Sequence, residues 1–249
     1  MKSNVSLENL QQECQELLLQ LKARTRKASR QRSHLRRFLE KARVDLARDL
    51  QDFPEFHGRH YEKYGEFRRS FELLDVQIQS LLKKLDEQAI TLPAPVSYPA
   101  SESIDEWLDH LDDLEEVLQD YERQLERQYR ADLLDLIKAL DTVERVVMLD
   151  IPSAMSGRKI YYSALEQLKQ TTQNLGRRLR NSLRGRFVKT IDIRVGQYPP
   201  LEITRFISRQ DDGTSDNIVV AQVIEKGYLW KGQVLRKVAV ITATQREED

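Results

Sequence analysis

The stretch Ile218–Ala243 reads IVVAQVIEKGYLWKGQVLRKVAVITA and is far richer in β-branched and aromatic residues than the rest of the chain. Side chains alternate between two faces from Val219 to Ile224 and again from Val234 to Val240, which is typical of β-strands. Lys231-Gly232 between them is a tight-turn signal. The stretch therefore predicts a β-hairpin. Apolar groups on both faces of the second strand predict that the hairpin packs within a small sheet domain.

More of this sheet is expected just upstream. The segment Phe187–Val195 alternates Val188, Thr190 and Asp192 with Lys189, Ile191 and Ile193, so it predicts the first strand. Asp211-Asp212-Gly213 is a loop tip before the hairpin. Apolar residues between these points are expected to pack the sheet: Leu201, Ile203, Phe206 and Ile207.

Two amphipathic helices are expected before the sheet. The longer begins at Ser103, where Glu106 completes a capping box, and runs to about Leu149, which gives it a length of roughly 70 Å. The shorter ends at Gly185. Its apolar stripe recurs at three- and four-residue spacing, with Leu183 beside the last turn: Tyr161, Leu165, Leu168, Thr172, Leu175, Leu179 and Ser182.

The long helix carries a heptad-like apolar stripe, which is typical of a coiled-coil seam. A stripe of this length needs a partner, most simply the same helix of a second subunit. The sequence thus predicts a homodimer in which two helices from each chain form a four-helix bundle. The predicted dimerisation residues are Ile104, Trp107, Leu111, Leu114, Leu118, Tyr121, Leu125, Leu136, Leu140 and Val143.

The N-terminal third, residues 7–89, is expected to be a helical hairpin. Its first helix begins near Ser6, and a corner at Pro54 and Gly58 precedes the second. His57 and His60 lie in this corner, but no third ligand has matching helical spacing, so we expect no metal site there. The two apolar stripes are Leu7, Leu10, Cys14, Leu17, Leu18 and Leu21, then Tyr64, Phe67, Phe71, Leu74, Ile78, Leu81, Leu82 and Leu85.

Charge is unevenly distributed along these helices. Between Lys22 and Arg43 ten basic residues face a single acidic one, Glu40. Such a surface suits nucleic acid or an anionic membrane, but an apolar stripe without interleaved stacking aromatics favours an acidic helix of the same molecule or dimer as its partner. Eight acidic and no basic residues lie between Glu102 and Glu116, which complements the helix dipole. Alternatively, this acidic block pairs with the basic section.

Proline residues indicate the domain boundaries, and the composition of the whole chain indicates the class of protein. Pro93, Pro95 and Pro99 make residues 91–103 a semi-rigid linker, so the N-terminal hairpin need not dock tightly on the rest of the chain. We expect a helical hairpin (1–90), this linker, a helical region (104–184) and a β-domain (185–249). The 249 residues are 32% charged with no net charge, and Cys14 is the sole cysteine. Together with the lack of a long apolar run, this predicts a cytoplasmic protein without a membrane span.

The strand and helix motifs together resemble the GrpE family, nucleotide exchange factors of DnaK-type chaperones. In the hairpin the resemblance rests on Val220, Val223, Gly227, Tyr228, Gly232, Val234, Leu235, Arg236 and Val240. In the long helix it rests on Asp141, Val143, Glu144 and Arg145, with Lys138 where the family usually has proline. The resemblance covers about residues 102–245, and the N-terminal hairpin has no counterpart in the ordinary family pattern.

The resemblance implies an α+β fold, with a long coiled-coil helix and helical bundle followed by a small C-terminal β-domain. It also implies a stress-response co-chaperone for protein folding, whose β-domain binds the nucleotide-binding domain of a DnaK-type chaperone and promotes ADP release. The implied contact residues are Gly227, Tyr228, Trp230, Lys231, Gln233, Leu235 and Arg236. For Tyr228 and Leu235, core packing is an equal alternative, whereas Trp230 and Lys231 flank an exposed turn and are expected to make contact.

Three departures from the family pattern keep another function open. Tyr198-Pro199-Pro200 replaces a phenylalanine-aspartate-proline element, Ile203 replaces a histidine, and Gln233 stands where a basic residue is common. The alternative is a coiled-coil scaffold that retains the GrpE fold without exchange activity. No catalytic constellation and no cofactor motif is present in the sequence, so we expect no enzyme activity.

Overall fold

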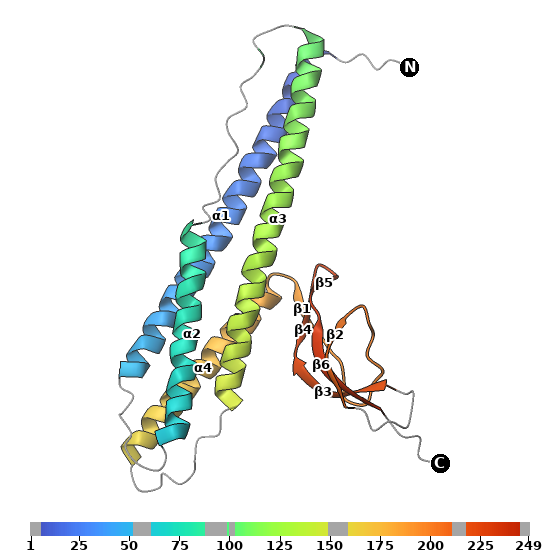
Figure 1. Cartoon of the computed structure of the whole chain (residues 1–249). Helices are drawn as coiled ribbons and strands as arrows, with labels where there is room; N and C mark the ends of the chain where they lie inside the picture. The colour runs from blue at the N-terminus through green and yellow to red at the C-terminus, as the bar shows by residue number, and fades with distance from the viewer. Residues whose placement is uncertain are drawn as a thin grey trace. The chain divides into compact units, whose positions relative to one another are not determined.

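The computed structural model describes residues 6–51, 61–87, 99, 103–148, 159–210 and 218–244. Within these residues four helices come first: α1 (Leu7–Gln51), α2 (Tyr61–Glu87), α3 (Ile104–Met148) and α4 (Lys159–Arg184). Figure 1 labels them in chain order. Six strands follow: β1 (Val188–Ile191), β2 (Thr204–Gln210), β3 (Ile218–Glu225), β4 (Gly227–Trp230), β5 (Gln233–Arg236) and β6 (Val238–Thr244). The fold is α+β, as predicted.

The chain divides into two compact units that interleave along the sequence. The first comprises Met1–Ala47 and Asp75–Asp132, and the second comprises Arg48–Leu74 and Leu133–Asp249. Helices α1, α2 and α3 each contribute a section to both units. The predicted domain boundaries, by contrast, cut the chain into consecutive segments.

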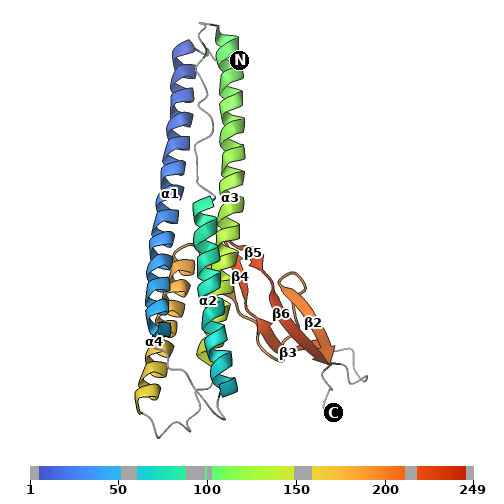
Figure 2. The same ribbon diagram turned by 60° about the vertical axis from the view of Figure 1, so that its left-hand side comes forward.

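In the first unit, α1 packs along α3 (Figures 1 and 2). Leu10 and Cys14 of α1 form a buried cluster with Trp107 and Leu114 of α3. The polar pairs Thr25 with Tyr121 and Arg32 with Asp132 continue this seam. The buried positions of α1 recur at heptad spacing: Leu10, Cys14, Leu21, Thr25, Ala28, Arg32, Leu35, Leu39, Ala42, Leu46 and Asp49. The linker did not require the N-terminal hairpin to dock on the rest of the chain, but this section of α1 does pack on α3, because the two matching stripes bury each other.

Several of the ten basic residues of α1 have acidic partners within the first unit. Arg24 pairs with Glu122, and the Arg32 Nε lies 3.2 Å from Asp132 Oδ2. Both carboxylates belong to α3, beyond the acidic block at residues 102–116, so that block is not the partner in these pairs. An internal acidic partner, the preferred interpretation of the basic section, is confirmed.

Helix α2 runs antiparallel to α1, as the predicted hairpin requires. Arg43 Nε lies 3.2 Å from Asp75 Oδ1, near the middle of α2, and the earlier Arg36 Nη1 lies 3.3 Å from Asp86 Oδ1, near its end. The corner with Pro54, His57, Gly58 and His60 lies outside the described residues, as does most of the linker.

In the second unit, α3 and α4 bring their apolar stripes together. Leu136, Leu140 and Val143 of α3 are each 1% exposed. A Cβ added at Gly176 of α4 would lie 2.9 Å from Val143 Cγ1, so the two helices approach closely there. The buried positions of α4 include the predicted Leu168, Thr172, Leu175 and Leu179, and Leu183 takes over the last turn. As predicted, α4 ends at Gly185, whose N–H donates to Asn181 O at 2.9 Å.

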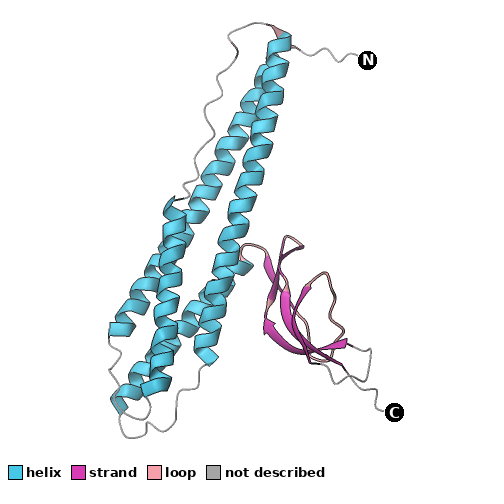
Figure 3. Ribbon diagram, in the orientation of Figure 1, coloured by secondary structure: helices cyan, strands magenta, loops and turns pink. Residues whose placement is uncertain are grey.

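The stretch Ile218–Ala243 forms one long hairpin, and each of its two arms contributes a strand to both sheets. The predicted first strand is β3 followed by β4, and the predicted second is β5 followed by β6. Strands β4 and β5 pair beside β1, whereas β3 and β6 pair beside β2, with β6 in the centre of the second sheet. Figure 3 shows the strands in magenta after the helices in cyan. The hairpin prediction is confirmed, but each arm is interrupted, at Lys226 and at Lys237, where it changes sheet.

The core of the second sheet is small. Val220, Val238 and Val240 form its buried cluster, against which Ile191, Ile193 and Val223 pack. Three residues expected to pack the sheet keep much of their surface exposed: Leu201, Phe206 and Ile207 are 64%, 44% and 50% exposed. In addition, β1 ends at Ile191 instead of Val195, because the chain turns after it and Gly196 adopts a φ of 86°.

Candidate functional site

The turn between β4 and β5 forms an exposed tip. Lys231 and Gly232 both have positive φ, 51° and 83°, which is the combination that a two-residue type I′ turn requires. Lys231, Gly232 and the following Gln233 are exposed, and the Lys231 ammonium lies 4.6 Å from the centre of the Trp230 ring. Of the seven predicted contact residues, Lys231 and Gln233 thus present their side chains to solvent.

Four of the seven predicted contact residues are instead part of the β-domain core. Tyr228, Trp230 and Leu235 are 4%, 7% and 6% exposed. A Cβ at Gly227 would lie 2.5 Å from Val238 Cγ2, so the strand packs too closely there for any other residue. The turn beside Trp230 is exposed, as expected, but the Trp230 side chain itself is buried, and contact of Trp230 with a partner stays a prediction.

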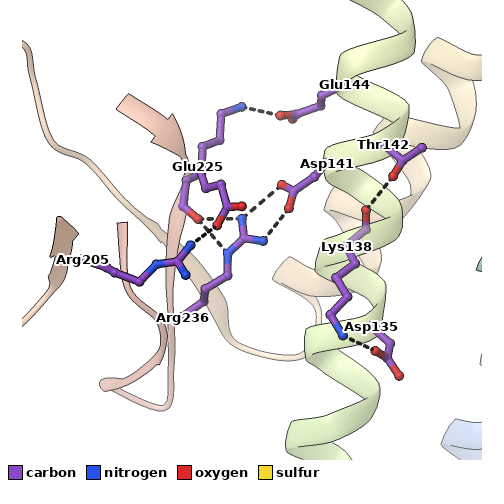
Figure 4. Close-up of polar contacts among 9 residues, drawn as sticks. Asp135, Lys138, Asp141, Thr142, Glu144, Arg205, Glu225 and Arg236 are labelled. Atoms are coloured by element: carbon purple, nitrogen blue, oxygen red, sulfur yellow. Dashed lines mark hydrogen bonds and ion pairs between the residues drawn. The ribbon is translucent and has the colours of Figure 1, made fainter. Parts of the chain in front are cut away.

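Arg236, the seventh predicted residue, anchors the β-domain to α3. Its guanidinium makes two hydrogen bonds to the Asp141 carboxylate, of which Nη2 to Oδ1 is 3.1 Å, and it also donates to Lys226 O from Nε at 3.0 Å and Nη2 at 2.7 Å (Figure 4). The guanidinium carbon lies 5.2 Å from the centre of the Tyr228 ring. This fork geometry fixes the strand against the helix in one orientation.

A second charged pair supports the same junction. Lys226 Nζ lies 2.6 Å from Glu144 Oε2, one helical turn beyond Asp141 on α3. Within the β-domain, Arg205 Nη2 of β2 lies 2.9 Å from Glu225 Oε2 at the end of β3. Burial, followed by the nearby carboxylates Asp141 and Glu144, raises the pKa of the Tyr228 hydroxyl to about 12. We call Asp141, Glu144, Lys226, Tyr228 and Arg236 the helix–sheet junction.

The junction unites the two halves of the motif that the sequence suggested. Asp141 and Glu144 come from the helix motif and Arg236 comes from the strand motif, 95 residues away from Asp141. Sequence reasoning placed Arg236 at a partner surface and gave Asp141 no role. The sequence did contain a signal for this contact: the helix motif carries the acidic Asp141 and the strand motif carries the basic Arg236, and these opposite charges pair within the chain.

The predicted dimerisation residues divide between the two units. In the first, Trp107, Leu114 and Tyr121 are buried, Leu111, Leu118 and Leu125 are half-buried, and Ile104 is 42% exposed. In the second, Leu136, Leu140 and Val143 are buried. Dimerisation through them stays a prediction.

Other chemistries find little support in the described residues. No three His, Cys, Asp or Glu side chains come together there as a metal site. His57 and His60 lie outside that part of the chain. No described helix combines the length and the apolar character that a membrane span requires.

Long helices followed by a small β-domain, which charged pairs fix to α3, define the class of α+β protein to which the chain belongs. The GrpE family model matches residues 65–244, which is most of the chain, and the chain therefore belongs to the GrpE family. A comparison with curated proteins finds no match. The family match begins inside α2, farther upstream than the sequence resemblance, so among the described helices α1 is the one that lies wholly outside it. Membership supports a co-chaperone role in nucleotide exchange in general.

Proposed function

We propose that this protein is a nucleotide exchange factor for a DnaK-type chaperone in the cytoplasm, and that it binds the chaperone's nucleotide-binding domain through the tip of the β4–β5 hairpin. The observation that carries the proposal is the exposed tip, Lys231 to Gln233, on a β-domain held to α3 by the junction. A rigidly mounted tip binds with a low loss of conformational entropy.

Exchange on this proposal works through differential affinity. A factor that binds the open nucleotide-binding cleft better than the closed one shifts the chaperone towards the open state, and contacts to ADP weaken. A rigid mounting matters because a tip that yields would not oppose closure of the cleft. Arg236, Tyr228 and Gly227 therefore act by positioning the tip, while Lys231 and Gln233 make the contact. Trp230 and Leu235 support the turn from within the sheet.

Exposed apolar side chains of the β-domain suit protein contact as well. Tyr198, Leu201, Phe206 and Ile207 are each between 44% and 68% exposed. We propose that these side chains add apolar contacts with the chaperone to the polar contacts of the tip.

The test is release of a fluorescent ADP analogue from the host's DnaK-type chaperones, with the wild type and with the double variant Lys231→Ala, Gln233→Ala. We expect the wild type to accelerate release and the double variant to lose most of that acceleration. Arg194→Ala is a matched control, because Arg194 is an exposed basic residue beyond Ile191, the end of β1 that pairs with Gly227 and is distant from the tip, so it should leave the rate unchanged. Phe206→Ser measures the apolar surface separately.

The alternative is a scaffold that retains the fold without exchange activity. It is motivated by Gln233 at the tip, by the exposed Tyr198 of the altered proline element, and by α1, which lies outside the family match. A correctly folded wild type that accelerates ADP release from none of the host's DnaK-type chaperones would contradict the exchange proposal and leave the scaffold.

A further inference from the structure

We propose that α1 takes, within the same chain, the place that a second copy of α3 would occupy in a dimer, so that the α3 seam at residues 104–132 is closed to self-association. This inference concerns assembly and does not rest on the proposed exchange function.

Helices α1 and α3 pair in parallel and in a constant register. The sequence separation between partners is 96 for Thr25 and Tyr121, 98 for Gln31 and Tyr129, and 100 for Arg32 and Asp132. A nearly constant separation means that both helices run in the same direction, as Figure 2 shows. Two identical α3 helices in a symmetric coiled-coil dimer would pair with this same parallel geometry. Helix α1 therefore covers the seam as a second α3 would.

Parallel pairing within one chain requires a long return path, and the sequence supplies one. A 45-residue helix such as α1 is about 68 Å long, and the chain must travel back along it before α3 can start beside its beginning. The 27 residues of α2, antiparallel to α1, cover about 40 Å of that return. Residues 88–103 reach up to about 50 Å when extended. Helix α2 and the proline-rich linker are thus together long enough to set α1 and α3 parallel.

Polar groups in the seam favour α1 over a second α3. The Thr25 and Tyr121 hydroxyls, both buried, lie 2.8 Å apart. Arg32, with its side chain 9% exposed, pairs with Asp132, whose side chain is 14% exposed. In a symmetric pair of α3 helices each seam residue would face its own copy, and Asp132 would meet a second carboxylate instead of a guanidinium. Leaving a partly buried charge without its partner is costly, so these contacts select α1.

The acidic block adds to this selection. A second α3 would set eight acidic residues from each copy beside one another between residues 102 and 116. The matching section of α1, residues 7–21, carries three, Glu8, Glu13 and Glu16. Repulsion along the first turns of the seam is therefore weaker with α1 than with a second α3.

The test is chemical cross-linking of the full-length chain in a Cys14→Ala background. Arg24 and Glu122 form an ion pair across the seam, and both side chains are more than 40% exposed, so cysteines there are accessible. In the double variant Arg24→Cys, Glu122→Cys, a short bis-maleimide is expected to link the two thiols within one chain. The product would migrate as a single chain, with a change in mobility and a peptide map that joins the two positions. Arg26→Cys, Glu122→Cys is the control, because Arg26 is exposed elsewhere on α1 and should give no such link.

Two results would overturn the proposal. With Glu122→Cys alone, a covalent dimer through that position would mean that α3 pairs with a second α3. When the Arg24→Cys and Glu122→Cys single variants are mixed after co-refolding, a covalent hybrid would mean that α1 pairs with α3 of another copy. Retained far-ultraviolet circular dichroism in every variant ensures that a missing link reflects pairing and not unfolding.

Discussion

The two sections of α3 are held by different kinds of contact. Residues 104–132 lie against α1 through a repeating seam, in which apolar groups predominate and polar pairs are interspersed. Residues 133–148 bury an apolar stripe and, on another side, hold the β-domain through Asp141 and Glu144. The apolar spacing of a seam fits any helix with matching spacing, and only the interspersed polar pairs distinguish one partner from another. A junction is specified by two particular charges and accepts only its own partner.

The largest effect should come from breaking the seam at its core. Leu114 is 2% exposed in the cluster with Leu10, Cys14 and Trp107. Leu114→Ala should lower the free energy of unfolding of the first unit by about 3 kcal/mol, because it removes buried methyl groups and leaves a cavity. Urea denaturation monitored by Trp107 fluorescence, in a Trp230→Phe background, measures this. Leu108→Ala on the same helix is the control, since Leu108 is 38% exposed and should lose less than about 1 kcal/mol. Equal losses would mean that α1 does not cover this seam.

Breaking the junction should cost less but act on function. Asp141→Ala leaves the partly buried Arg236 guanidinium without its carboxylate, and the second unit should lose about 2 kcal/mol. ADP release should slow as well, because the tip is no longer firmly mounted. Lys138→Ala is the matched control on the same helix. Its ammonium pairs with Asp135 at 3.0 Å but is 67% exposed, so stability should change by less than about 0.5 kcal/mol (Figure 4).

The double-mutant cycle of Asp141→Ala and Arg236→Ala sharpens this prediction. If the two residues act on each other, the double variant should be little worse than either single variant. Fully additive losses would mean that Asp141 and Arg236 stabilise the protein separately and that the junction is not a pair.

The difference between the seam and the helix–sheet junction also explains how much of the fold could be predicted from the sequence. Periodicity placed the helices well: Ser103 precedes α3, Gly185 follows α4, and the heptad spacing marked Trp107 and Leu114 as seam residues. Periodicity does not identify the partner of a seam, because α1 and a second α3 both match it. The structure resolves this ambiguity for the single chain by placing Leu10 and Cys14 against Trp107.

At the candidate site the sequence identified individual residues but not their contacts. Gly227, Tyr228 and Arg236 were recognised by resemblance, and the two-residue turn was recognised from Lys231-Gly232. Alternation within a strand does not show which face a second sheet covers, so the sequence could not predict that the Trp230 side chain is buried and that Phe206 is 44% exposed. The pairing of Asp141 with Arg236 depends on tertiary proximity, for which a strand pattern and a helix pattern give no distance.

The junction should also give the protein a specific weakness in alkali. Because the pKa of Tyr228 is raised from 10 to about 12, the folded protein keeps this proton where the unfolded chain loses it. Stability is then unaffected below pH 10 and falls between pH 10 and 12, by roughly 1.4 kcal/mol at pH 11. Denaturation of wild type and Tyr228→Phe at pH 9 and pH 11 measures the difference. The variant should lose less stability over this interval, and parallel losses would contradict a buried, proton-retaining Tyr228.

The smallest effect concerns the ion pairs of α1. It tests whether a buried ion pair of the seam couples more strongly than an exposed ion pair elsewhere on α1. Arg43 and Asp75 pair with side chains 46% and 23% exposed, whereas Arg32 and Asp132 pair with side chains 9% and 14% exposed. Water and salt screen the first pair, so its coupling in a double-mutant cycle should be about 0.5 kcal/mol or less and should fall further at high ionic strength. The second pair should couple more strongly and respond less to salt. If Arg43 and Asp75 couple as strongly as Arg32 and Asp132, burial does not strengthen the polar pair of the seam, and the preference of α3 for α1 must rest on the acidic block at residues 102–116 instead.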